Sequence, residues 1–337
     1  MKIDEHLQLL FEGKMCEAKA VRFSTIPDRL VKFIWLDGSE SDHKKFLSLG
    51  RNEIWFAQKD YLNDPYEYKG MLLDRNKLLN AGYSNDIIAY YQQLFDFRDY
   101  GITCLSANSI DYLPMWAYYT NNHKGFCVEY EVIKKDCIHE VLYEPERIKV
   151  ASLIFQSREA IKKAIILGRR EQAEFYSTLF LQNLFIKAKS WEHEKEYRIV
   201  YPLDNDIGMN IPVSNLGLRT SRIVAGINCS KNDIVRLNEI SNELGLGNVY
   251  KSRVHSEKYT LDYIIHCGKE IVLFGWFPEA VQVVYALKKA GVTVHYVCEV
   301  DQVPIGEFEN GMPVGDGLVL KNYRELLKES EKYFFFF

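Results

Sequence analysis

In residues 114–130, PMWAYYTNNHKGFCVEY, a helical pattern gives way to a strand pattern, and this change recurs along most of the chain. Residues 114–119 begin with a proline, whose fixed φ suits the first turn of a helix, and they predict a helical turn. Residues 125–130 alternate in the manner of a strand. The stretch therefore predicts a short helix that is followed closely by a strand.

The same two patterns alternate from the N-terminus to residue 262. Short apolar runs predict strands at residues 30–36, 53–57, 102–106, 196–201, 222–226 and 249–254. Helical spacing predicts helices over residues 1–20, 42–49, 71–99, 155–189 and 231–244. We therefore predict that residues 1–262 form an α+β first domain with short mixed or antiparallel strands.

The pattern differs in residues 263–337. An apolar run at 270–274, a helical stretch at 278–290 and a second apolar run at 292–297 predict a βαβ unit. Such a unit normally pairs its two strands in parallel. We predict a small, incomplete, Rossmann-like α/β module at the C-terminal end of the chain.

The first turn of this module does not favour a dinucleotide. Gly275 is followed by Trp276, so the turn lacks the further glycines that let a backbone approach a pyrophosphate. Docking of a partner is the expected role, although Asp301 stands where a ribose-binding acid would lie and keeps the nucleotide alternative open. The aromatic run YFFFF at 333–337 is expected either as a buried strand or as the mark of a cut chain.

The composition limits the class of protein. The 337 residues carry a formal net charge of −4, which gives no general affinity for nucleic acid or acidic membranes. Seven cysteines without a CxxC pair indicate free thiols in a reducing compartment, with no metal-binding motif. No apolar run approaches the roughly 18 residues of a membrane span. We expect a cytoplasmic protein, and the aromatic content of 14% suggests ring-lined pockets.

Four segments carry polar residues inside apolar runs, namely residues 54–64 (IWFAQKDYLND), 102–106 (ITCLS), 115–130 and 189–200 (KSWEHEKEYRIV). Together they resemble a widespread bacterial family, the domain of unknown function 2971. The resemblance covers residues from about 28 to 260. It implies no activity, so the chemistry has to come from the residues themselves.

The last segment contains the strongest catalytic candidates. A strand over residues 191–200 would place Glu192, Glu194, Glu196 and Arg198 on one face. Carboxylates so close together repel one another unless cations or a ligand neutralise them. One interpretation is a salt-bridged edge strand that faces solvent. The other is a polar cleft beside Trp191, in which one glutamate orients a ribose hydroxyl or acts as a base.

A second candidate group surrounds His123. Lys124 and Gly125 follow it at the entrance of a strand, and Trp116 and Tyr119 precede it. An aromatic shelf beside His and Lys suits a base or nicotinamide ring together with a phosphate. The alternative is that the aromatic residues belong to the core and that His123 is a turn residue.

The turn at Asn63 and Asp64 is most simply an Asx-type turn that positions Tyr66 and Glu67, with a place in a ligand site as the alternative. The candidate ligand-binding residues are Lys32, Asn63, Asp64, Trp116, Tyr119, Lys124, Tyr130, Trp191 and Arg198. The candidate catalytic residues are His123, Glu194 and Glu196.

By analogy, the arrangement is similar to that of mono-ADP-ribosyltransferases. Lys32 or His123 would take the early basic position and Tyr130 the middle position. Glu194 and Glu196 would form the late acidic motif, in which Glu196 holds the nicotinamide ribose. The analogy implies NAD or another nucleotide as the substrate, and an effector in phage defence.

Two other classes remain open. The first is a non-catalytic protein that binds a ligand or a protein partner and docks through its C-terminal module. The second, which the acidic composition favours least, is a nuclease in which Asp64, Glu194 and Glu196 bind a metal.

Overall fold

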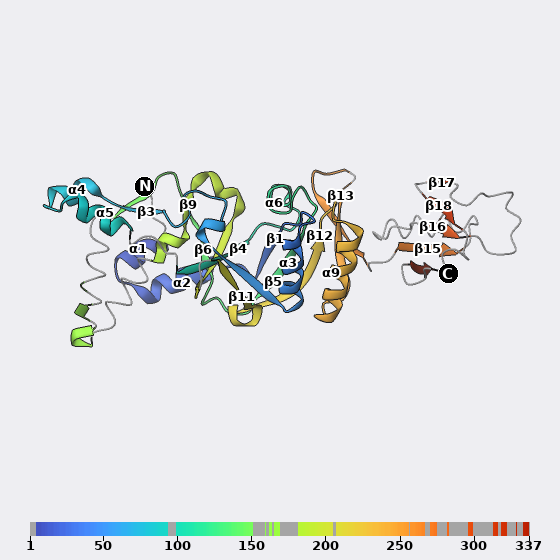
Figure 1. Ribbon diagram of the computed structural model, residues 1–337, viewed down its shortest axis with the longest axis horizontal. Helices are drawn as coiled ribbons and strands as arrows, with labels where there is room; N and C mark the ends of the chain where they lie inside the picture. Colours follow the sequence, from blue (N-terminus) through green and yellow to red (C-terminus); the bar gives the residue numbers. More distant parts are fainter. Residues whose placement is uncertain are drawn as a thin grey trace, which may run out of the picture. The chain divides into compact units, whose positions relative to one another are not determined.

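The computed structural model describes residues 5–93, 99–150, 181–204, 207–255 and 257–266, together with short segments at 159, 162–163, 165–168, 270–274, 282, 296–298, 313–315, 318–321, 328 and 333–336 (Figure 1). The protein is a mixed α+β protein with a large, mostly antiparallel sheet, which confirms the predicted α+β class.

The large sheet has ten strands. Eight of them follow the order β11 (Gly208–Pro212), β2 (Glu53–Gln58), β4 (Tyr100–Ser106), β1 (Arg29–Ile34), β5 (Phe126–Val132), β12 (Leu218–Ala225), β13 (Val249–Val254) and β14 (Leu261–His266). The other two are β10 (Glu196–Pro202), which pairs with β4, and the short β6 (His139–Glu140), which pairs with β10. All the strands predicted in the first domain are present.

The chain forms two compact units that interleave in sequence. Unit 1 comprises residues 1–32, 51–109 and 129–220, and unit 2 comprises residues 33–50, 110–128 and 221–337. The predicted boundary between residues 262 and 263 stays a prediction.

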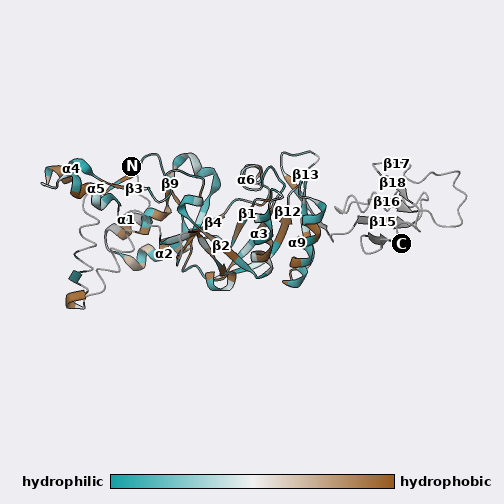
Figure 2. Cartoon of the chain, in the orientation of Figure 1, coloured by the Kyte–Doolittle hydropathy of each residue, from teal (hydrophilic) through white to brown (hydrophobic). Residues whose placement is uncertain are grey.

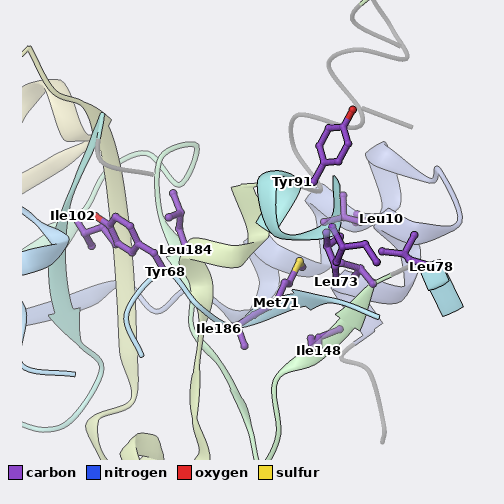
Figure 3. Close-up of a cluster of buried hydrophobic side chains, with 13 residues drawn as sticks. Leu10, Tyr68, Met71, Leu73, Leu78, Tyr91, Ile102, Ile148, Leu184 and Ile186 are labelled. Atoms are coloured by element: carbon purple, nitrogen blue, oxygen red, sulfur yellow. The ribbon is translucent and has the colours of Figure 1, made fainter. Parts of the chain in front are cut away.

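Unit 1 holds a hydrophobic core beside several short elements. These are α1 (Glu5–Phe11), α2 (Met15–Thr25), β3 (Met71–Leu73), α4 (Arg75–Asn80), α5 (Asn85–Gln93), β7 (Leu142–Glu144), β8 (Ile148–Val150), η2 (Gln182–Phe185) and β9 (Ile186–Ala188). Leu10, Met71 and Leu184 are at most 2% exposed and belong to one cluster of buried side chains (Figure 3). Burying such side chains contributes roughly 1.5–3 kcal/mol each.

Unit 2 packs the helix α3 (Glu40–Gly50) against the helix α9 (Lys231–Glu243). The Ser230 hydroxyl begins α9 by accepting from the Asp233 N–H at 3.1 Å, as an N-cap does. Along α9, hydrophobic and hydrophilic residues alternate (Figure 2), because Ile234 and Leu237 are buried on one face. The short helix α6 (Leu113–Tyr119) leads into β5, as predicted.

A five-stranded sheet lies within residues 270–336. Its order is β17 (Pro313–Gly315), β18 (Leu318–Lys321), β16 (Tyr296–Cys298), β15 (Glu270–Phe274) and β19 (Tyr333–Phe336). The strands β15 and β16 pair in parallel, which confirms that part of the βαβ prediction. The aromatic run forms β19, also parallel to β15. Of the predicted helix at 278–290, only residue 282 is among the described residues, and the Rossmann-like interpretation stays a prediction.

Three helix predictions were wrong in part. In place of one helix over residues 1–20, the described residues 5–25 form two helices, because the chain turns at Gly13 with φ +79°. Residues 71–73 are a strand, since β3 pairs with β8 and the Asp74 side chain then caps α4. Residues 186–188 are a strand that pairs with β7. In the last two places, pairing with a distant strand outweighs local helix propensity.

The entrance to β5 leads to a test of the backbone packing in unit 2. A Cβ added to Gly125 would lie 2.0 Å from the Ile34 carbonyl oxygen, whereas one added to Gly50 would meet only the Ile240 side chain at 3.9 Å. We expect Gly125→Ala to lower the free energy of unfolding by about 1–3 kcal/mol, as overpacking does. Gly50→Ala should change it by less than about 0.5 kcal/mol. Equal changes in the free energy of urea unfolding for Gly125→Ala and Gly50→Ala would contradict this packing.

Candidate functional site

Five charged side chains of unit 1 meet in a cluster that we call the buried ion network. Its members are Glu67, Lys187, Glu194, Glu196 and Arg198, and each side chain is at most 4% exposed.

Each cation of this network contacts at least two of its carboxylates. The Lys187 ammonium donates to Glu194 at 2.7 Å and to Glu196 at 3.1 Å. The Arg198 Nε donates to Glu196 at 2.7 Å, and its Nη2 donates to Glu67 at 2.9 Å. Glu196 therefore has one oxygen bonded to Arg198 and the other bonded to both cations, since Nη2 also donates to it at 3.2 Å.

A left-handed residue gives the network its local shape. Residues 189–194 form the 3₁₀-helix η3 (Lys189–Glu194), and Lys195 follows with φ +45° before β10 begins. The predicted strand over 191–200 was therefore wrong for 191–195. Glu192 is exposed and pairs with Lys189 instead of sharing a strand face with Glu194. The turn at Lys195 is what lets Glu194 and Glu196 contact one ammonium group.

The Glu194 backbone is anchored on β4 and the residues after it. Its carbonyl oxygen accepts from the Ser106 hydroxyl at 2.6 Å and from the Asn108 amide at 3.0 Å. The amide of Ala107 donates to the Lys195 carbonyl at 2.9 Å. These bonds satisfy the polar backbone of the turn.

The carboxylates of the network have opposite electrostatic environments. Burial alone would raise the pKa of Glu196, but Arg198 and Lys187 outweigh it and lower that pKa to about 2. Burial raises the pKa of Glu67, and the neighbouring Glu196 charge adds to the rise while Arg198 and Lys187 oppose it. Three carboxylates face two cations, and the network favours the charge of Glu196 while it disfavours that of Glu67.

Lys32 and Cys104 adjoin the network. The Lys32 ammonium donates to the Thr103 hydroxyl at 2.8 Å and to the Cys104 carbonyl at 3.2 Å. Burial lowers the pKa of Lys32, and the nearby Glu196 charge opposes that change. Burial also raises the pKa of the Cys104 thiol well above its usual range, so Cys104 is a weak nucleophile.

Two aromatic side chains touch the network. The Lys187 ammonium lies 4.7 Å from the ring centroid of the half-buried Trp191, a cation–π contact. The Tyr143 hydroxyl accepts from the Glu196 backbone N–H at 2.8 Å. Trp191 is a site residue predicted from the sequence, whereas Tyr143 and Lys187 are not.

The turn at Asn63 and Asp64 has the predicted Asx form. The Asp64 Oδ1 accepts from the Tyr66 N–H at 2.8 Å, and the Asp64 carbonyl accepts from the Glu67 N–H at 3.1 Å. The turn thereby directs Glu67 towards Arg198. The motif NDPYE had suggested that Glu67 is positioned by this turn, but not which cation it meets.

The residues around His123 belong to unit 2. Trp116 is fully buried, and its indole N–H donates to the Ile110 carbonyl at 2.5 Å. The His123 ring stacks on it, with centroids 6.1 Å apart and planes within 6°. Trp116 is thus a core residue, whereas Lys124 is exposed and Tyr119 half-buried.

The backbone before Lys124 is strained. Asn121, Asn122 and His123 are consecutive non-glycine residues with φ of +53°, +54° and +66°. The left-handed region costs such residues about 1–2 kcal/mol each, less for Asn. Asn228 helps to hold them, because its N–H donates to the His123 carbonyl at 3.0 Å and its side chain donates to the Asn122 carbonyl at 3.0 Å.

The predicted site residues therefore divide into two groups. Unit 1 brings together Lys32, Trp191, Glu194, Glu196 and Arg198, with the Asn63–Asp64 turn beside Glu67. The buried Tyr130 is also in unit 1. Unit 2 holds Trp116, Tyr119, His123 and Lys124. Their roles in binding or catalysis stay predictions.

Within the described residues, no helix is long and apolar enough to cross a membrane. The same residues contain no group of three or more His, Cys, Asp or Glu side chains placed to hold a metal ion.

The fold and the network define a mixed α+β protein with a buried polar centre. Residues 115–199 match the family described as Protein of unknown function (DUF2971). The chain thus contains a DUF2971 domain, which includes the α6–β5 turn and most of the buried ion network. The wider resemblance from residue 28 to 260 is confirmed only over these residues. No curated protein and no solved structure matches the chain.

The opposite pKa shifts predict unequal effects of two matched substitutions. Glu196→Gln removes a charge that the fold holds ionised with a pKa near 2, so we expect a loss of about 3 kcal/mol in the free energy of unfolding at pH 7. The lowered pKa means that this stability is present above the unfolded pKa and is lost as the pH falls towards 2.

Glu67→Gln should cost clearly less at pH 7, because the raised pKa of Glu67 shows that the fold disfavours its charge. Urea unfolding of both variants and the native chain between pH 3 and pH 7 measures the difference. A larger loss for Glu67→Gln would contradict this description of the network.

Proposed function

We propose that this protein is a non-catalytic, ligand- or partner-binding regulatory protein, in which the buried ion network stabilises the fold. The observation that supports the proposal best is the position of Glu196. Its side chain is 3% exposed, and both of its carboxylate oxygens accept from Arg198 or Lys187.

A catalytic carboxylate has to come within roughly 2.6–3.2 Å of the substrate atom on which it acts. Glu196 would have to leave Arg198 or Lys187 to do so. Breaking a buried ion pair costs about 3–5 kcal/mol, because it leaves an uncompensated charge. The geometry is therefore better suited to holding η3, β9 and β10 together than to a catalytic step.

The binding role would lie with groups that reach solvent. Lys124 is exposed, His123 is half-buried, and Tyr118 on the preceding helix is 64% exposed. A small nucleotide or a protein partner is the ligand class we propose. The C-terminal residues 263–337 would dock the partner, whether or not they form a Rossmann-like module.

A second candidate function is an ADP-ribosyltransferase-like enzyme that uses NAD in a defence response in the cytoplasm. One observation favours it: Glu194 and Glu196 do converge with cations, as an acidic motif in a transferase would. This function requires a substrate to displace Lys187 or Arg198 from Glu196 before any chemistry.

An NAD assay separates the two functions. The full chain, shown to be folded by circular dichroism, is incubated with labelled NAD and cell lysate. We expect no label transfer and no release of nicotinamide, because Glu196 is inaccessible.

Nicotinamide release that is lost in Glu196→Gln but retained in the exposed control Glu192→Gln would overturn the proposal in favour of the transferase. Each variant is compared only at a temperature where its unfolding curve shows it folded, so that lost activity is not lost folding.

A further inference from the structure

A small cavity in unit 1 is separate from the buried ion network. Its volume is about 30 Å³, which exceeds the roughly 10–15 Å³ that one water needs. It is lined by His6, Arg22, Thr25, His139, Glu140 and Gln182. These residues come from α1, α2, β6 and η2, so polar groups surround the cavity from several elements.

Arg22 is the positive charge of this cavity. Its Nη1 donates to the His139 Nε2 at 2.6 Å and to the Ile138 carbonyl at 3.4 Å. Among the described residues it forms no ion pair with a carboxylate. The nearby Asp136 is paired with Lys19 at 3.0 Å. Arg22 thus keeps a charge that a bound anion could neutralise.

Both imidazoles are fixed beside Arg22. The His139 ring stacks on Phe185 with centroids 4.1 Å apart and planes within 11°. Burial lowers the pKa of His139 well below its usual range, and the charges of Arg22 and His6 lower it further. His139 is therefore neutral and can accept from Arg22. The His6 Nδ1 lies 2.8 Å from the Ala18 carbonyl oxygen, which holds that ring in place.

Glu140 makes the cavity selective among anions. A carboxylate accepts hydrogen bonds and repels a fully deprotonated oxyanion, but it can accept an O–H from hydrogen phosphate. Sulfate has the same tetrahedral shape and no proton at neutral pH. A ligand of this cavity should therefore offer two anionic oxygens to Arg22 and one O–H to Glu140.

We propose that this cavity binds free hydrogen phosphate, with Arg22 as its charge partner and Glu140 as the acceptor of its O–H. The inference rests on the proposed binding function and adds to it a second ligand site, in unit 1. Arginine suits this task because its guanidinium can donate two parallel hydrogen bonds to an oxyanion.

The test is calorimetric titration of the full chain at pH 7 and constant ionic strength, with inorganic phosphate, sodium sulfate and AMP in separate runs. We expect saturable phosphate binding that is about tenfold or more tighter than sulfate binding, as one charge-assisted hydrogen bond allows. Arg22→Gln should weaken it by about tenfold or more for the same reason. Arg219→Gln, in an exposed pair with Glu131, is the matched control and should bind as the native chain does.

Glu140→Gln provides a second readout, because Glu140 is exposed and its replacement leaves the core untouched. This variant should bind sulfate about as well as phosphate, since the repulsion is gone. A phosphate monoester has a second pKa of about 6 and carries almost no O–H at pH 7, so AMP binding without binding of free phosphate would overturn the proposal.

Equal affinity of the native chain for phosphate and sulfate would overturn the proposal, as would affinity that Arg22→Gln leaves unchanged. Failure of the phosphate-binding proposal is distinguishable from failure of the proposed function. Nicotinamide release would overturn the binding role without affecting phosphate affinity, and lost phosphate selectivity would remove the cavity without creating an enzyme.

Discussion

The buried guanidinium of Arg198 is the constraint on which much of unit 1 depends. Its side chain is fully buried, and it donates to Glu196, to Glu67 and, through Nη1 at 2.6 Å, to the Leu184 carbonyl. A guanidinium cannot lose its charge in a protein, so each buried donor needs an acceptor. The turn before β3, the helix η2 and the strand β10 must therefore lie where they do, although 131 residues separate Arg198 from Glu67.

The same constraint positions the features that surround the network. The strand β10 pairs with β4 over its whole length, from Glu196 opposite Ser106 to Pro202 opposite Tyr100. On its other edge, Arg198 lies opposite His139 in β6, which lines the small cavity. Loss of the network would thus displace the cavity wall as well as the turn at Lys195. A fold-stabilising centre and a cavity can lie on two paired strands, β10 and β6, without sharing side chains.

Much of the fold could be predicted from short apolar runs and helical spacing, because β2 alternates buried and more exposed positions and β4 is a short run of mostly buried residues. The site was only partly predictable. The three carboxylates near Arg198 in the sequence need a further cation to neutralise them. No pattern in the neighbouring sequence predicts that Lys187 is that cation. The left-handed backbone of Lys195 could not be predicted either, because the sequence EKEYR has the same alternation as the strand that follows. Pairings across more than a hundred residues, such as Glu67 with Arg198, require the tertiary structure.

Urea unfolding of Arg198→Met at pH 7, beside Arg219→Met, tests this account most directly. Both substitutions remove an arginine that pairs with glutamate in unit 1, but Arg198 is fully buried and Arg219 is 69% exposed. We predict a loss of about 3–5 kcal/mol for Arg198→Met, which leaves Glu67, Glu194 and Glu196 buried with Lys187 as the one remaining cation of the network. Arg219→Met should cost no more than about 1 kcal/mol. Similar losses for the two variants would contradict a fold that depends on the buried ion network.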